Sequence, residues 1–113
     1  MIEFKNLTKK KIQTNEFKKL YKKIFIKNFE LSIVFAEPSL MLSLNKKYRN
    51  KNKPADVLSF QLEKRRGEIF LNVEKKNLSY LFLHGALHLK GMAHQNIREA
   101  EKMEALEKKL LKS

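Results

Sequence analysis

The chain contains no cysteine, and this absence excludes two classes of structure. Without thiols there is no disulfide framework and no thiolate metal site, so any metal must be held by nitrogen and oxygen ligands. The sequence also lacks any run of about 18 apolar residues, the length that a membrane span needs. Its opening, MIEFKNLTKK, lacks the apolar core of a signal peptide. These absences predict a cytoplasmic protein with no membrane partner.

No feature of the sequence divides the chain into parts. It contains no internal repeat, no low-complexity tract and no linker that would separate two domains. A chain of 113 residues falls within the usual size of one domain. At this size a chain buries roughly two-thirds of its unfolded surface, which is enough for a hydrophobic core. We therefore expect residues 1–113 to form a single domain.

The charge is strongly one-sided. Lysine and arginine number 25 against 12 aspartates and glutamates, which gives a formal net charge of +13. A domain this basic attracts polyanions, and nucleic acid is the commonest of them. A lysine-rich composition also arises from genome-wide bias, and charge carries no information about catalysis. RNA contact is therefore the expectation, with the chemistry left to other residues.

Hydrophobic periodicity predicts the order strand, helix, strand, helix, two strands and two helices. The expected strands cover residues 1–6, 29–37, 57–63 and 68–73, the last two joined by a basic KRRG turn around Gly67. The expected helices begin at Thr14 or Asn15, at Glu37, at Asn77 and at Asn96. The second strand alternates as a half-buried strand does, and the third helix is apolar nearly all round, as a buried central helix is. This order predicts an α+β or α/β fold with helices packed on one sheet.

All three histidines, His84, His88 and His94, lie within the stretch HGALHLKGMAH. Residues four apart share one face of a helix, so two imidazoles can reach one ion at about 2.0–2.1 Å. Gly91 is placed to end the helix, and His94 could then supply a third nitrogen from the next loop. Three protein ligands with one open position are typical of catalytic zinc. The alternative is a set of hydrogen-bonded core histidines, but an apolar helix favours a common partner for three buried rings.

Gly85 follows the first histidine at the position where zinc proteases carry a glutamate base, which argues against peptide hydrolysis. A metal that activates water, on a basic surface, suits cleavage of a phosphodiester better. Such a reaction needs a cation at the phosphate, and arginine provides a planar fork of donors for it.

The stretch at 84–94 resembles the H-G-x-L-H-L-x-G-x-D-H signature of the YbeY family of bacterial ribosomal-RNA maturation endoribonucleases. LNKKYRNKNKPADVLSF at 44–60 is similar to a second family block, GEIFLN at 67–72 to the strand that follows it, and EAEKMEALE at 99–107 to the C-terminal helix. The resemblance implies an α+β fold with one mostly parallel four-stranded sheet and the HxxxH pair on a central buried helix. It also implies a metal-dependent, single-strand-specific endoribonuclease acting in 3′-end maturation of small-subunit ribosomal RNA and in ribosome quality control.

The resemblance further implies site residues. One zinc ion per chain is expected on His84, His88 and His94, and Arg49 matches an arginine to which a role near the RNA phosphate is assigned. Arg49, His84 and His88 are accordingly the expected catalytic residues. The neighbouring lysines are expected to bind ribosomal RNA of the small subunit: Lys46, Lys47, Lys51 and Lys53. Ser59 lies where the family's strand borders the metal cleft, to orient water or RNA or, alternatively, to bond the backbone.

The sequence departs from the family pattern in three places. Ala93 replaces an aspartate before the third histidine, Ala55 replaces a threonine, and the connection VEKKNLSY before the histidine helix is short. A missing carboxylate beside the ligands removes a support for them. Two alternative functions therefore stay open: a ribosome-associated RNA-binding factor with a structural or weakly active metal site, and a metal-dependent hydrolase of another substrate.

Overall fold

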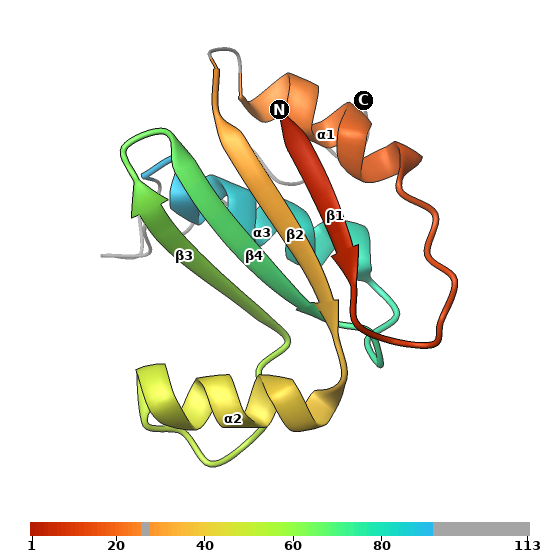
Figure 1. Cartoon of the computed structure of the whole chain (residues 1–113), viewed down its shortest axis with the longest axis vertical. Coiled ribbons are helices and arrows are strands. Elements are labelled where there is room, and N and C mark those ends of the chain that lie inside the picture. Colours follow the sequence, from red (N-terminus) through yellow and green to blue (C-terminus); the bar gives the residue numbers. More distant parts are fainter. Residues whose placement is uncertain (26–27, 92–113) are drawn as a thin grey trace.

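The structure is a computed structural model that describes residues 1–25 and 28–91. The expected helix from Asn96, together with His94 and Ala93, lies outside these residues. The described chain follows the predicted order of strands and helices (Figure 1). The elements are β1 (Ile2–Asn6), α1 (Asn15–Ile24), β2 (Glu30–Ala36), α2 (Pro38–Arg49), β3 (Val57–Glu63), β4 (Arg66–Asn72) and α3 (Leu78–Leu89).

The strands form one four-stranded sheet in the order β1-β2-β4-β3. β1 pairs with β2 and β2 with β4 in parallel, whereas β3 and β4 form an antiparallel hairpin. Ile33 in the centre of β2 lies between Phe4 of β1 and Ile69 of β4. The predictions of an α+β fold and of a mostly parallel sheet are therefore confirmed.

Two helices cover one face of the sheet. The rings of Phe17 on α1 and Phe82 on α3 meet edge to face with their centroids 5.5 Å apart, and Phe17 contacts Phe35 of β2 in the same manner. All three side chains are buried, and they centre the larger of the two hydrophobic clusters. The strongly apolar composition of α3 is thus explained by its burial between α1 and the sheet.

Within the described part of the chain, α2 is the helix that covers the opposite face, at the lower end of the sheet in Figure 1. Met41 of α2 is buried in a smaller cluster with Ala36, Ala55 and Leu58. Because helices lie on both sides, β2 is not the half-buried strand that its alternation predicted: Val34 and Ala36 are buried as well as Ile33. That expectation was wrong because the pattern was interpreted with only one covered face.

The β3–β4 turn also differs from the prediction. It is formed by Lys64 and Arg65, and Gly67 lies inside β4, paired with Gln61 of β3. A Cβ on Gly67 would lie 2.8 Å from Cδ1 of Leu89, so this glycine lets α3 approach the sheet closely. The glycine marks a packing contact and not the turn.

The ends of α3 agree with the predicted positions. Asn77 is the N-cap residue, although its side chain makes no capping hydrogen bond and its carbonyl accepts one from the amide of Leu81. Gly91 has a φ of 94°, a left-handed conformation that favours glycine after the last turn of a helix. The helix that carries His84 and His88 therefore ends where the sequence indicated.

Candidate functional site

The two histidines of α3 meet at their ring nitrogens. His84 and His88 lie one helical turn apart and are both half-buried. The Nε2 atoms are 3.0 Å apart, and the ring centroids are 4.6 Å apart with planes inclined by 68°. Helical spacing alone would leave the rings free to diverge, so their convergence is a property of this structure.

The donor set of this pair fits a metal ion. Two nitrogens on one tetrahedral zinc at about 2.0–2.1 Å lie about 3.3 Å apart, close to the observed separation. The separation of 3.0 Å also suits a hydrogen bond between two neutral imidazoles. Among residues 1–25 and 28–91, no group of three or more histidine, cysteine or acidic side chains could hold a metal. A third ligand from the predicted set, His94, lies outside that part of the chain.

Contact with β3 fixes the position of the histidine helix. The Ser59 hydroxyl donates a hydrogen bond to the Gly85 carbonyl at 3.1 Å, between the two histidines along the chain. A Cβ on Gly85 would lie 2.6 Å from the Ser59 Oγ and 3.1 Å from Cγ2 of Val57. Of the two roles considered for Ser59, this is the bond to the backbone; a role toward water or RNA stays a prediction.

The same contact explains why no glutamate follows the first histidine. Gly85 faces the sheet and is fully packed against β3 and β4, so a side chain at this position has no room. The protease arrangement is therefore excluded by packing as well as by sequence.

Arg49 and the predicted lysines form an exposed basic segment, residues 46–53, at the end of α2 and in the loop that follows. Arg49 is the last residue of the helix and has no hydrogen-bond or ion-pair partner in the described part of the chain. The ammonium group of Lys47 lies 5.2 Å from the centroid of the Tyr48 ring. Lys46, Lys51 and Lys53 are exposed. These cations are available to a polyanion.

Asn45, which no motif in the sequence marks, holds this basic segment in place. Its side chain is 2% exposed, and its Nδ2 donates to the Lys53 carbonyl at 2.8 Å. Its backbone carbonyl accepts from Lys51 at 3.2 Å, and Asn50 adopts a left-handed φ of 54° to turn the chain. The available signal was a polar residue four positions after Met41, on the apolar face of the helix.

The basic segment and the histidine pair lie on opposite faces of the sheet, joined by β3. Phe60 packs under Tyr48 of α2, with centroids 5.1 Å apart, while the adjacent Ser59 bonds to α3. Arg49 forms no hydrogen bond or ion pair with His84 or with His88. The described structure thus brings the two histidines together, and it places Arg49 on the other side of an edge strand.

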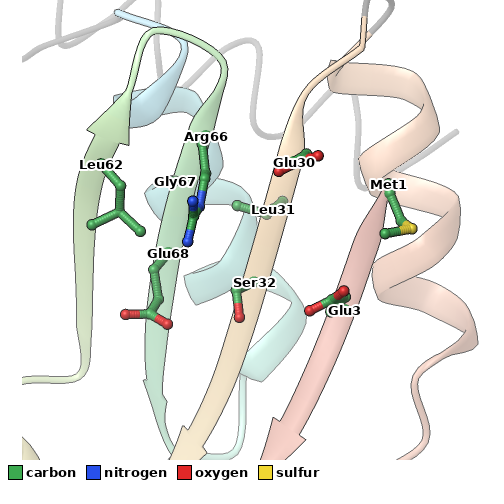
Figure 2. Close-up of a pocket in the computed structure, with 9 residues that line it drawn as sticks. All are labelled: Met1, Glu3, Glu30, Leu31, Ser32, Leu62, Arg66, Gly67 and Glu68. Atoms are coloured by element: carbon green, nitrogen blue, oxygen red, sulfur yellow. The ribbon is translucent and has the colours of Figure 1, made fainter.

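The upper part of the α2 face is an acidic hollow, shown in Figure 2. Glu3, Ser32 and Glu68 are register neighbours across β1, β2 and β4, and Glu30 lies above them. Arg66 lines the same hollow, but its guanidinium lies 3.7 Å from the Glu63 carboxylate. In a chain of net charge +13 this is an unfavourable surface for RNA.

No helix in the described residues combines the length and the apolar character required to cross a bilayer.

Comparison with known proteins gives a consistent result. The sequence model of the family described as Endoribonuclease YbeY matches residues 2–113. Three proteins named Endoribonuclease YbeY are among the similar sequences. The one from Rubrobacter xylanophilus is 38% identical over 90 residues, covering 74% of this chain and 67% of that protein. The one from Pelagibacter ubique is 38% identical, covering 77% and 70%. The one from Buchnera aphidicola is 35% identical, covering 86% and 77%.

A solved structure supports the fold. The solution structure of TM1509 from Thermotoga maritima superimposes with a TM-score of 0.64 at 24% identity, and the match covers 97% of this chain and 86% of that one. This likeness concerns the fold alone. The sequence matches carry the assignment further, and they confirm the resemblance first seen around the histidines. The chain belongs to the YbeY family of endoribonucleases, which are RNA-cleaving hydrolases.

Proposed function

We propose that this protein is a metal-dependent endoribonuclease specific for single-stranded RNA, acting in 3′-end maturation of small-subunit ribosomal RNA and in ribosome quality control. The observation that carries the proposal is the convergence of His84 and His88, whose Nε2 atoms lie 3.0 Å apart on a buried helix. With His94 they would hold one zinc ion per chain. The family assignment supports RNA as the substrate, and a cytoplasmic location is part of the same proposal.

The protein's own groups have separable tasks in this scheme. His84 and His88 are held by α3, whose position is fixed by the Ser59–Gly85 bond and by close packing on the sheet. A bound zinc ion supplies Lewis acidity and an activated water. Arg49 and the lysines of the basic segment bind the RNA backbone and balance charge at the phosphate.

A second candidate is an RNA-binding factor whose metal site is structural or weakly active. Ala93 favours it, because the family signature has an aspartate at this position. A carboxylate beside a ligand orients imidazoles, and its loss typically lowers metal affinity or activity by about 10- to 100-fold. A hydrolase of another substrate is the third candidate, and the packing of Gly85 argues against its peptide form.

Cleavage of a single-stranded RNA separates these candidates. The wild-type protein, loaded with zinc, should contain about one metal equivalent and cut the RNA internally, and a chelator should stop the reaction. His88→Ala should lose both metal and cleavage. Arg49→Ala should keep its metal and lose about 10²–10³-fold in rate, as removal of one charge-stabilising donor does. Lys9→Ala is the matched control: Lys9 is exposed and far in sequence from Arg49, so this variant should cleave normally.

Two results would decide against the proposal. Tight RNA binding without cleavage by the metal-loaded wild type favours the binding factor, and Ala93→Asp should then restore turnover. Absence of metal from protein prepared with excess zinc removes the metal site altogether.

A further inference from the structure

A second hollow lies at the opposite end of the β3–β4 hairpin from the basic segment. It is bordered by the end of α1, the start of β2, the hairpin turn and the end of α3. Three of its lining side chains are apolar: Phe25, Phe29 and Leu89. Three are cationic: Lys64, Arg65 and Lys90. Among residues 1–25 and 28–91, no acidic residue lines it, in contrast to the acidic hollow of Figure 2.

The apolar side of this hollow is aromatic. The rings of Phe25 and Phe29 stack with centroids 4.5 Å apart and planes inclined by 19°. Phe25 is buried, whereas Phe29 is only partly buried and lines the hollow as the outer ring of the pair. The Tyr21 hydroxyl donates to the Phe29 carbonyl. Burial, and then the nearby Glu30 carboxylate, raise the pKa of Tyr21 above 10.0, so this donor stays protonated at neutral pH.

The cations of the hollow differ in how they are held. Lys64 and Arg65 are exposed in the hairpin turn, and neither side chain has an ion-pair partner in the described part of the chain. Lys90 donates to the Ile24 carbonyl at 2.6 Å, which fixes its ammonium group at the junction of α1 and α3. Three positive groups therefore surround an aromatic surface, two of them adjustable and one fixed.

We propose that this hollow is a subsite for one unpaired nucleotide of single-stranded RNA, with its base on Phe29 and its phosphates on Lys64, Arg65 and Lys90. Aromatic rings beside cations are the combination with which proteins bind single strands. A base in a duplex is stacked and paired, so only an unpaired base can enter. The inference rests on the proposed function, because it names a substrate contact for the same reaction.

The chain connects this subsite to the histidines. Lys90 follows His88 by two residues, so the two are offset by about 3 Å along the axis of α3. Residues two apart on a helix do not face each other, so the hollow lies at the end of α3 and the RNA must continue along this helix to reach His84 and His88. A base held here would select single strands beside the helix that carries the histidines.

Binding of a fluorescein-labelled eight-residue oligouridylate to the zinc-loaded full chain, followed by anisotropy, tests the subsite. Phe29→Leu, which keeps the apolar volume, should weaken binding about tenfold through loss of stacking. Phe29→Tyr should bind as the wild type does. The slope of log K for binding against log salt concentration measures the number of phosphate contacts, at about 0.7 for each contact with a single strand. The double variant Lys64→Ala/Arg65→Ala should therefore reduce the magnitude of this slope by about 1.4. Lys5→Ala/Lys9→Ala removes the same charge elsewhere and should change affinity less than about twofold.

Photo-crosslinking identifies the residues that contact the bound base. An oligonucleotide with 5-iodouridine should crosslink to peptides that contain Phe25, Phe29 or Gln61, and Phe29→Leu should reduce the yield. The proposal is overturned if Phe29→Leu binds with wild-type affinity or if crosslinks map elsewhere. Displacement of the probe by poly-glutamate as effectively as by unlabelled RNA also overturns it, since the hollow would then receive an acidic protein segment.

The outcome is distinguishable from failure of the proposed function. His88→Ala should abolish cleavage and leave oligonucleotide affinity within about twofold, because it removes the reaction and not the subsite. If the wild type cleaves while Phe29→Leu and Lys64→Ala/Arg65→Ala bind normally, the subsite is wrong and the nuclease stands. If the probe crosslinks to Phe29 and the wild type does not cleave, the subsite stands and the nuclease is wrong.

Discussion

The two faces of the sheet differ in how helices cover them. α1 and α3 cover one face with a large core that includes Phe17, Phe35 and Phe82. In the described residues, α2 covers part of the other face, and the hollow lined by Glu3, Glu30 and Glu68 lies on the same face. The histidine pair lies on the covered side, and the exposed basic segment belongs to the helix of the partly covered side.

This difference separates two requirements of a nuclease. The histidines need fixed geometry, and close packing supplies it, because a packed interior leaves few alternative rotamers. RNA binding needs accessible cations, and an exposed helix end with a loop supplies those. We expect the acidic hollow on the α2 face to disfavour RNA there by like-charge repulsion. The four tests below address this division, beginning with the largest expected effect.

The covered face should dominate stability. Phe82 is fully buried, so Phe82→Ala should lower the free energy of unfolding by about 3–5 kcal/mol. Phe60 is partly buried on the α2 face, so Phe60→Ala should lower the free energy of unfolding by about half as much. Guanidinium unfolding of both variants measures the difference. Equal losses would show that α2 packs the second face as firmly as α1 and α3 pack the first.

The contact between α3 and β3 should tolerate no added atoms. Gly85→Ala places a Cβ 2.6 Å from the Ser59 Oγ, which should reduce stability by about 1–3 kcal/mol. In a Ser59→Ala background the penalty should be about 1 kcal/mol smaller, since the nearest atom is removed. Ser43→Ala, which removes a hydroxyl bonded to the Ser39 carbonyl on α2, is the control and should show no coupling to position 85.

Replacement of Asn45 should change the conformation of the basic segment more than the packing of the core. Asn45→Ala removes its hydrogen bond to the Lys53 carbonyl, which should lower stability by about 1 kcal/mol. Trypsin should then cut faster after Lys51, and RNA affinity should fall with it. Asn52→Ala alters an exposed residue of the same loop and should change neither quantity. An unchanged cleavage rate in Asn45→Ala would show that the loop holds its shape without this side chain.

The acidic hollow should give the smallest effect. Glu68→Gln removes one negative charge from the open sheet face and should raise affinity for single-stranded RNA by less than about twofold at physiological salt, where screening is strong. Its effect should disappear at higher salt. A large gain, or a loss, would mean that RNA passes over this surface.

Much of the fold was predictable because the local signals were strong. Alternation located the strands, and the apolar character of α3 predicted its burial. The signals failed where a residue's neighbour is distant in sequence: Gly67 was taken for a turn because Leu89, which it accommodates, lies on another element. The position of β4 between β2 and β3 is likewise a long-range pairing that periodicity does not contain.

For the site, spacing placed His84 and His88 on one helical face, but it did not give the convergence of their rings. Arg49 was predicted as a phosphate contact, and its separation from the histidines by β3 followed only from the topology. The hollow beside Phe29 has no sequence signature, because its lining residues come from four parts of the chain.

The strand order also has a consequence for synthesis of the chain. β3 leaves the ribosome before β4, yet β4 is the strand with which it pairs in the described sheet. The β1–α1–β2 unit has its own partner strands and can assemble early, whereas β3 and α2 wait until residue 72 has emerged. The β3–β4 hairpin should close in about 1–10 μs. Pairing of β4 with β2 should be slower, because these strands are farther apart in sequence. The nascent chain should therefore contain its basic segment before β3 and β4 have joined the sheet.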